Sequence, residues 1–420
     1  MKNSDILKCL KANKKISSYE FVVTNKDSRE LYYVLDHLEI NRAVKTTNKG
    51  VAVYVNTKDK TGSSRFTIIE ADDVRSLNKK INAAALKAKA GLNKFYPIAS
   101  KTKNINTKEK KYDLNDIACK IGKAVYKADT FKNGWLNSTE IFVSNVKKEF
   151  INSNGVHHIT SSLSIKIEVI PTWKGEKEEI ELYKFYESNV VNYDEITNEV
   201  KQLLENAKQR SIAKTLSQVK LPKNLKVLVS NDMLTSIVDC IKNDCSYRCN
   251  FQKANHFKVN DLICDPSLNL TLVPSVKGCS KSKLFDEDGI VLSKKQLIKD
   301  GKLLDNFGSI RFGTYLNKKK ITGDVPVSVV EGKRYNYKKE KHLIIENFSS
   351  PQLDESIGYW GGEVRLARYF DGKKYIPLTG FSISGNIYDD LKSVKLSKEN
   401  INLSDYSGPK YWIFNNISIH

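Results

Sequence analysis

The sequence of 420 residues predicts an α+β fold in two domains. Segments with the alternating pattern of half-buried strands occur along the whole chain, whereas helical spacing of apolar residues ends near residue 241. No repeat of solenoid or propeller length is present, and the length fits two domains of ordinary size. We therefore expect a mixed N-terminal domain resembling an α/β sandwich at residues 1–218 and a mainly antiparallel β domain at residues 219–420.

The N-terminal part begins with two predicted strands, Tyr19–Val23 and Ala43–Val55. Apolar residues with helical spacing then predict a helix that a left-handed Gly91 ends. The segment Lys101–Lys111 lacks periodicity and large apolar residues, so we expect an exposed connection there. The two helices of this stretch are predicted from Leu77, Ile81, Ala84, Ala85 and Ala88, and from Ile117, Ile121, Ala124 and Val125.

A β-hairpin and a helix complete the predicted N-terminal domain. Strands Glu140–Phe150 and Val156–Ile170 flank Ser153-Asn154-Gly155, where Asn-Gly supplies the positive φ angles of a tight turn. The second strand alternates between apolar and polar residues, and Pro171 is expected to end it. Asp194 is the predicted cap of a helix whose apolar stripe is Ile196, Val200, Leu203, Leu204 and Ala207.

The second domain is predicted to begin after residue 218, where periodicity stops, with the strand Leu225–Val229 close behind. A short helix capped by Asn231 should bury Met233, Leu234, Ile237, Val238 and Ile241. Farther on, Asp371-Gly372 is expected to join two hairpin strands, Val364–Phe370 and Lys373–Leu378. The run Tyr411–Phe414 predicts a buried strand.

Composition narrows the class of protein. Hydrophobic residues make up 40% of the chain and charged residues 28%, as in ordinary globular proteins. No apolar stretch is long enough to span a membrane, and charges near the start exclude the apolar region of a signal peptide, so we expect a cytoplasmic protein. The 7 cysteines then indicate reduced thiols rather than a disulfide framework.

The net charge of +21 is compatible with an anionic partner. The lysines are dispersed along the sequence, however, and no nucleic-acid-binding module is recognisable. We therefore do not expect nucleic acid to be the partner.

Common catalytic motifs are absent from the sequence: there is no phosphate loop, no dinucleotide-binding glycine motif, no nucleophile elbow and no His-Glu-x-x-His. His157 and His158 are neighbours in a predicted strand, so their rings should point to opposite faces. We do not expect them to share a metal ion. Asp239, Asp244 and the run Asp286-Glu287-Asp288 are interpreted as acidic groups in contact with solvent.

Soft metal ligands are concentrated in one stretch of the second domain. Thiolates and imidazole are the ligands that zinc prefers, but the spacing matches no common zinc ribbon or finger and no Cys-x-x-Cys occurs. Burial of the cysteines as small apolar residues is the simpler interpretation. The stretch contains Cys240, Cys245, Cys249, His256, Cys264 and Cys279, of which the first four are the candidate zinc ligands.

Several motifs of the second domain resemble the TldD/PmbA family of peptidase-related proteins. One is Gly289-Ile290-Val291 leading to Leu297–Leu303 and then Phe307–Gly313. The more specific one is Gly361-Gly362-Glu363-Val364-Arg365 followed by the run Pro377–Asn386. Asn152–Val156 and the alanine-rich helix at residues 83–90 are similar to the family's N-terminal half.

The resemblance implies both a chemistry and a departure from it. TldD-type members are zinc peptidases with His-Glu-x-x-x-His on a helix and a cysteine ligand near the C-terminus. The corresponding segment here is Asp239-Cys240-Ile241-Lys242-Asn243-Asp244, and the last cysteine is Cys279. The chain is therefore identified with the PmbA/TldE-like branch, for which the resemblance implies no peptidase activity of its own and zinc only in a catalytic partner.

The family is linked to proteolytic trimming of peptides, degradation of unfolded polypeptides and an older description as modulators of DNA gyrase. The implied partners are a second copy or a TldD-type catalytic subunit, together with an unfolded peptide substrate. Because an open sheet edge can bind an extended peptide, the strand with Gly361, Gly362, Glu363 and Arg365 is the candidate peptide-binding segment.

Three alternatives stay open. The chain could be a divergent metallo- or thiol-dependent peptidase that uses the Cys240–Cys279 cluster, or a DNA- or gyrase-associated binding protein. The third is a protein that keeps the family fold without any activity.

Overall fold

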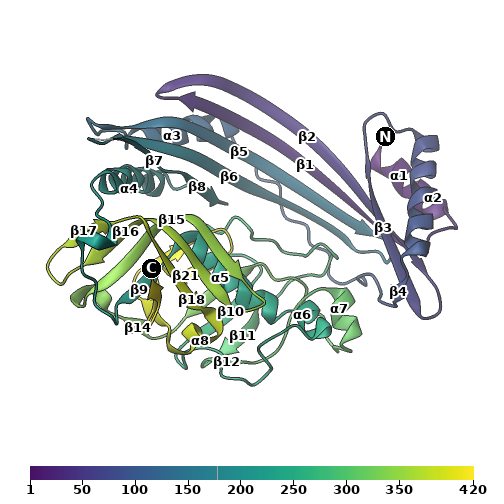
Figure 1. Ribbon diagram of the computed structural model, residues 1–420. Helices are drawn as coiled ribbons and strands as arrows, with labels where there is room; N and C mark the ends of the chain where they lie inside the picture. The colour runs from purple at the N-terminus through teal and green to yellow at the C-terminus, as the bar shows by residue number, and fades with distance from the viewer. Residues whose placement is uncertain (177) are drawn as a thin grey trace.

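The computed structural model describes residues 1–176 and 178–420 and confirms the α+β class. Figure 1 shows a long curved sheet from the first half of the chain lying over a more compact body from the second half. The described residues form three sheets, one N-terminal and two C-terminal.

The N-terminal sheet has the strand order β4-β3-β2-β1-β5-β6-β7, with β8 also paired to β6. Its four central strands are long and antiparallel, so they bridge the two ends of the domain (Figure 1). The strands are β1 (Ser18–Val34), β2 (His37–Asn56), β3 (Lys60–Ile68), β4 (Asn93–Lys94), β5 (Gly134–Asn152), β6 (His157–Lys174), β7 (Glu179–Glu181) and β8 (Lys184–Ser188).

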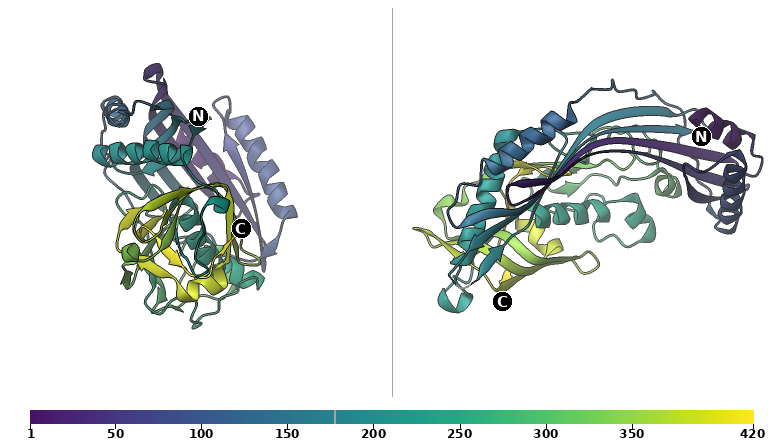
Figure 2. Two further views of the ribbon diagram at one scale, coloured as in Figure 1. Left: turned by 60° about the vertical axis from the view of Figure 1, so that its left-hand side comes forward. Right: turned by 90° about the horizontal axis from the view of Figure 1, so that it is seen from above.

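Helices cover the two ends of this sheet separately, as the view from above shows (Figure 2). At one end α1 (Asn3–Ala12) and α2 (Val74–Ala90) pack on β1, β2 and β3 around a core that contains Ile6, Phe21 and Ile81. At the other end α3 (Leu114–Tyr126) and α4 (Tyr193–Ser211) pack on β5 and β6. The predicted apolar stripe of α4 is buried there in full.

Four local predictions in the N-terminal half are wrong: two concern helix ends and two concern the β5–β6 hairpin. Gly91 has a φ of −105°, and its N–H instead donates to the carbonyls of Lys87 and Ala88. The α4 cap is Asn192, whose side chain accepts from the N–H of Glu195, rather than Asp194.

The other two concern the β5–β6 hairpin. Gly155 alone supplies a positive φ in its turn, so Asn154 does not share that role. Pro171 lies inside β6 rather than at its end. On the facing strand β5, the pairing register shifts between Leu136 and Ser138, opposite Pro171. The hydrogen-bond pattern between the two strands is interrupted there, so a residue without a backbone N–H is tolerated.

The C-terminal part consists of two sheets whose pairs are mostly antiparallel, as predicted. Three pairs are parallel: β9 with β15, β13 with β21, and β14 with β19. The six-stranded sheet has the order β12-β11-β10-β13-β21-β20, and the nine-stranded sheet has the order β14-β19-β22-β9-β15-β16-β18-β23, with β17 paired to β16.

The strands of these two sheets are β9 (Lys226–Val229), β10 (Asn269–Val273), β11 (Lys295–Lys299), β12 (Lys302–Leu303), β13 (Val327–Glu331), β14 (Arg334–Tyr335), β15 (His342–Asp354), β16 (Tyr359–Phe370), β17 (Tyr375–Leu378), β18 (Phe381–Asn386), β19 (Lys395–Ser397), β20 (Asn400–Asn402), β21 (Tyr406–Pro409), β22 (Trp412–Phe414) and β23 (Ser418–Ile419). The predicted strand at the end of the chain is buried as β22. The β16–β17 connection has four residues, 371–374, because Phe370 pairs with Tyr375.

Helix α5 (Asn231–Asp244) shares the largest core with strands of both C-terminal sheets. All five predicted apolar residues of this helix are buried. The predicted cap is wrong by one residue: Ser230 is the cap, and Asn231, whose φ of +53° is left-handed, is the first residue of the helix. The shorter helices are α6 (Tyr247–Gln252), α7 (Ile310–Tyr315), α8 (Ile387–Asp390), η1 (Leu216–Gln218), η2 (Tyr337–Lys339) and η3 (Leu391–Ser393).

Side chains from both halves pack together. Phe150 and Val156 share a small core with Phe285, and Tyr54 shares another with Tyr315. The buried His158 contacts the carbonyl of Gly289 through Nε2 at 3.1 Å. Within residues 1–176 and 178–420, no helix is long and apolar enough to cross a membrane.

Candidate functional site

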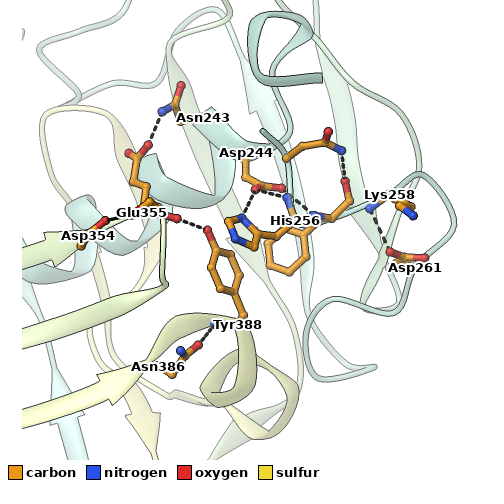
Figure 3. Close-up of polar contacts among 12 residues, drawn as sticks. Asn243, Asp244, His256, Lys258, Asp261, Asp354, Glu355, Asn386 and Tyr388 are labelled. Carbon is orange, nitrogen blue, oxygen red and sulfur yellow. Dashed lines mark hydrogen bonds and ion pairs between the residues drawn. The ribbon is translucent and has the colours of Figure 1, made fainter. Parts of the chain in front are cut away.

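A cavity of about 560 Å³ lies at the C-terminal end of α5. We call it the C-end cavity. Figure 3 shows that its polar side chains come from α5, from the segment after α6, from the hairpin between β15 and β16, and from α8. The residues used below are Cys240, Asn243, Asp244, Cys249, His256, Glu355 and Tyr388.

The three motif positions on α5 do not converge. Cys240 and Asp244 are four residues apart, so they lie on one face of the helix and both line the C-end cavity. Asp239 lies outside this lining and is about half exposed, with Oδ1 accepting from Lys242 Nζ at 3.1 Å. Lys242 Nζ also donates to the carbonyl of Pro326 at 3.0 Å. Asp239 is therefore part of a local ion pair.

Asp244 is the central acceptor of the C-end cavity. Only 5% of this residue is exposed, so the expectation that Asp244 is in contact with solvent is wrong. Its Oδ1 accepts from the backbone N–H of His256 at 2.7 Å and lies 3.2 Å from His256 Nδ1, while Oδ2 accepts from the N–H of Phe257 at 2.9 Å. The carboxylate thus holds the segment after α6 against α5 (Figure 3).

His256 and the hairpin residues complete the wall. The ring of His256 stacks on Tyr388, with centroids 4.0 Å apart and an interplanar angle of 23°. Tyr388 Oη donates to the carbonyl of Glu355 at 2.5 Å, and Asn243 donates to the Glu355 carboxylate (Figure 3). These contacts connect α8 and the β15–β16 hairpin to α5. Burial raises the pKa of Tyr388 above its usual value, so the phenol remains protonated and able to donate.

The thiols of this region are in environments that keep them protonated. Burial raises the pKa of Cys240 to about 12, and the negative charges of Glu355 and Asp244 add to the effect. Burial likewise raises the pKa of Cys245 and of Cys249, where Asp244 again contributes. Because a thiolate is the reactive form of cysteine, these environments disfavour a nucleophilic role at neutral pH.

Cys264 and Cys279 have separate buried surroundings. Cys264 Sγ lies 3.7 Å from the carbonyl of Gly301, and Cys279 Sγ lies 3.4 Å from the carbonyl of Tyr406. Burial raises the pKa of each to about 12. Neither lines the C-end cavity, so the stretch of soft ligands in the sequence is not one cluster in space.

The zinc ion of the resembling peptidases does not fit the donors of the C-end cavity. A structural zinc needs four convergent ligands, and a catalytic zinc needs three. Asp244 is already engaged by three nitrogen atoms, and His256 Nδ1 is one of them. Among the described residues, no group of three or more His, Cys, Asp or Glu side chains is placed to hold a metal ion.

The candidate peptide-binding strand lies in the interior of its sheet. Gly361 and Gly362 in β16 pair with β15 on one side and with β18 on the other. The expectation that this strand offers an open edge is therefore wrong. The glycines are required by packing, because a Cβ on Gly361 would lie 2.1 Å from the carbonyl oxygen of Ile383. Glu363 is exposed, and Arg365 Nη2 donates to the carbonyl of Glu181 at 2.6 Å.

The acidic run before Gly289 is not a solvated loop throughout, so the expectation of solvent contact is wrong there as well. Asp286 is completely buried and accepts from the backbone N–H groups of Asp288, Ile290 and Asp324. Burial raises the pKa of Asp286 to about 7, with the charge of Asp288 adding to the effect. The carboxyl group organises this turn from inside the protein.

His157 and His158 point to opposite faces as predicted. His157 is exposed and contacts Glu149 Oε1 at 2.8 Å, whereas His158 is buried. Sequence reasoning missed Glu355 and Tyr388 as parts of the C-end cavity. Each lies more than a hundred positions after α5 in the chain, and no local motif marks either one.

Three solved structures have the same fold. TldE from Thermococcus kodakarensis is 14% identical with a TM-score of 0.81, and the alignment covers 99% of both chains. A protein described as a modulator of DNA gyrase from Thermotoga maritima is 13% identical with a TM-score of 0.75 and 96% of both chains covered. Another such protein, from Bacteroides thetaiotaomicron, is 16% identical with a TM-score of 0.77, covering 99% of this chain and 96% of its own.

No curated protein matches the sequence. Residues 222–420, however, match the PmbA/TldA metallopeptidase C-terminal domain. This match contains the motifs from Gly289 to Asn386 that suggested the family. Residues 222–420 therefore belong to the TldD/PmbA family, as those motifs predicted, and the whole chain has the fold of the three solved structures.

Proposed function

We propose that the chain is a non-catalytic or degenerate member of the TldD/PmbA family. In this proposal it acts in the cytoplasm as a dimer and holds unfolded peptide for proteolysis by a TldD-type zinc subunit. The observation that carries the proposal is that the carboxylates at the motif positions on α5 are already bonded to other protein groups. Asp239 is paired with Lys242, and Asp244 is bonded to His256 and Phe257.

These contacts support a structural role for the end of α5 that carries the motif positions. A carboxylate that satisfies three N–H donors stabilises the chain segment that carries them, and it loses those bonds if it turns toward a metal ion. The raised pKa of Cys240 acts in the same direction, because a thiol must lose its proton to bind zinc. Proteolysis therefore requires a partner that supplies the metal.

An open edge of the N-terminal sheet supports the dimerisation part of the proposal. In the described chain, residues 37–48 of β2 pair only with β1, since β3 begins its pairing at Lys49. Nearly all these residues are exposed, including Leu38 and Ile40 at 44% and 46%. Unpaired backbone groups in a strand of this length are a template for a strand of another chain.

The proposed function is tested with the purified chain and a fluorescent unstructured peptide. Fluorescence anisotropy measures binding, and mass spectrometry measures cleavage, both with and without a chelator. We expect binding without cleavage by the chain alone, and cleavage after addition of a TldD-type subunit from the same organism. Cleavage by the chain alone that a chelator abolishes would contradict the proposal.

The dimer is tested separately by sedimentation analysis of Ile40→Lys. A charged side chain on the open edge of β2 should convert the dimer to monomer. Leu86→Lys is the matched control, because Leu86 is 71% exposed on α2, away from this edge. A monomeric unmodified chain, or a dimer that survives Ile40→Lys, would contradict the role given to β2.

A further inference from the structure

A second cavity, of about 280 Å³, lies at the opposite end of α5. We call it the N-end cavity. Its walls come from both halves of the chain, with residues 182–185 around the start of β8 on one side, and the start of α5 and the middle of β15 on the other. Apolar wall residues are Tyr183, Phe185, Met233 and Phe348, and polar ones are Ser230, Asn347, Lys184 and Arg365.

Two side-chain oxygens in this wall are buried without a hydrogen-bond partner. Ser230 is 7% exposed, and its Oγ forms no hydrogen bond in the described structure. The Oδ1 atom of Asn347 is also buried and forms no hydrogen bond in the described structure. Buried polar groups are almost always paired in folded proteins, so these two atoms point to a ligand that offers an acceptor to the Ser230 hydroxyl and a donor, such as a peptide N–H, to Asn347 Oδ1.

The helix end adds donors to the same place. Ser230 is the N-cap of the 14-residue helix α5, but its side chain makes no capping bond. The first backbone N–H groups of a helix have no partner inside the helix, and those of Asp232 and Met233 have none outside it in the described residues. The helix dipole also places partial positive charge at this end.

The charged residues indicate the chemistry of the ligand. Lys184 and Arg365 both line the N-end cavity. Of the acidic residues in its wall, Glu346 is paired with Arg368, and Asp232 is exposed at the rim. A hydroxyl, helix N–H groups and two cations together favour an oxyanion, while the aromatic and aliphatic wall accommodates an apolar group beside it.

We propose that the N-end cavity binds the C-terminal residue of a peptide, with its carboxylate at Ser230 and Arg365 and its apolar side chain against Tyr183 and Phe185. Capture of a terminal carboxylate by N–H groups is an established mode of peptide recognition. This inference rests on the proposed function, in which the chain binds unfolded peptide, and it specifies where the end of the peptide lies.

The test compares two forms of one fluorescent unstructured peptide ending in leucine, one with a free carboxylate and one amidated. Anisotropy titrations of the full-length chain should show at least about tenfold weaker binding of the amide. Ser230→Ala and Arg365→Gln should weaken binding of the free acid to the level of the amide and leave binding of the amide unchanged. Thermal unfolding of each variant confirms that it is folded.

Two control variants keep the comparison specific. Arg334→Gln removes a guanidinium that also donates to a backbone carbonyl, that of Ser397, but lies outside the N-end cavity. Ser161→Ala removes a hydroxyl that donates to Asn145 in the N-terminal sheet. Both should bind the free-acid peptide as the unmodified chain does.

The possible failures are distinguishable. Equal binding of free acid and amide would overturn the carboxylate assignment while the proposed function stands. Failure of both peptides to bind would overturn the proposed function and the inference with it. Inorganic phosphate is the second probe: if it raises the melting temperature in a Ser230-dependent way while the two peptides bind equally, the site takes a free anion and its assignment to a peptide terminus is wrong.

Discussion

The two ends of α5 differ in how their polar groups are satisfied. At the C-terminal end, Asp244 accepts from the N–H groups of His256 and Phe257, and Asn243 donates to Glu355. At the N-terminal end, Ser230 Oγ and Asn347 Oδ1 have no partner in the described structure. The C-terminal end is where the resemblance to the family places the metal motif, yet the N-terminal end has the open hydrogen-bonding capacity that a ligand requires.

This difference shows that the positions that match the family motif and the positions that are free to bind a ligand lie at different ends of α5. A zinc site requires side chains that are free to bind the metal, whereas Asp244 and Asn243 at the C-terminal end of α5 already form hydrogen bonds to neighbouring loops. The other end keeps a buried hydroxyl and unpartnered helix N–H groups at a loss of stability. We therefore propose that the C-terminal end of α5 has a structural role and that its N-terminal end binds the ligand.

Thiol labelling should show the largest effect at the structural end. A pKa of about 12 for Cys240, against the ordinary 9.0, lowers its thiolate fraction about 1000-fold at neutral pH. Because a thiolate of higher pKa is also more nucleophilic, the rate falls by less than this fraction, and we expect iodoacetamide to modify Cys240 in the native chain at least about tenfold more slowly than in urea, as measured by mass spectrometry. Labelling of native Cys240 at the unfolded rate would restore the thiol-dependent peptidase as a candidate.

Replacement of the central acceptor should have the next largest effect. Asp244→Ala leaves the buried N–H of Phe257 and the part-buried N–H and ring nitrogen of His256 without their acceptor, so the free energy of unfolding should fall by about 2 kcal/mol or more. Asp239→Ala, which breaks a half-exposed ion pair, should cost less than about 1 kcal/mol. Urea denaturation measures both. Equal losses would remove the distinction between the two motif carboxylates.

Gly361 and Gly362 of β16 were expected to bind peptide, so their replacement tests whether they have a structural role instead. Gly361→Ala places a Cβ 2.1 Å from a backbone oxygen, and we expect a loss of about 2 to 3 kcal/mol in urea denaturation. Gly380→Ala is the control, since nothing lies within 4 Å and only its φ of +69° opposes a side chain, at about 1 kcal/mol. A Gly361→Ala variant of normal stability would contradict the packing role.

The smallest change in stability is expected at the recognition end. Ser230→Ala removes a hydroxyl that has no partner, so the free energy of unfolding should change by less than about 0.5 kcal/mol or rise. Ser144→Ala removes a buried hydroxyl that lies 2.9 Å from Ser28 Oγ and should cost about 1 kcal/mol. If Ser230→Ala is the more destabilising variant in urea denaturation, Ser230 is structural.

Much of the fold was predictable because apolar periodicity directly reflects which side of an element is buried. The stripes of α4 and α5 and the alternation in β6 were all located correctly. The caps and turns were not, because Gly91, Asn192 and Ser230 are distinguished by backbone angles that the residue type only weakly determines.

The site was predictable only where its residues lie on one element. The spacing of Cys240 and Asp244 places them on one helix face, and the resemblance to the family drew attention to that face. Glu355 and Tyr388 reach the C-end cavity from the β15–β16 turn and from α8, both far along the chain. The unpartnered Ser230 is equally invisible in the sequence, because the lack of a partner depends on everything that surrounds it.

The metal content of the chain tests the central claim most directly. The claim is that the C-terminal end of α5 has lost its zinc site and that proteolysis needs a metal-bearing partner. Elemental analysis of the chain, purified without added metal or a histidine tag, should find much less than one zinc per chain. About one zinc per chain, lost on replacement of Cys240 or Asp244 by alanine in a folded variant, would contradict the claim.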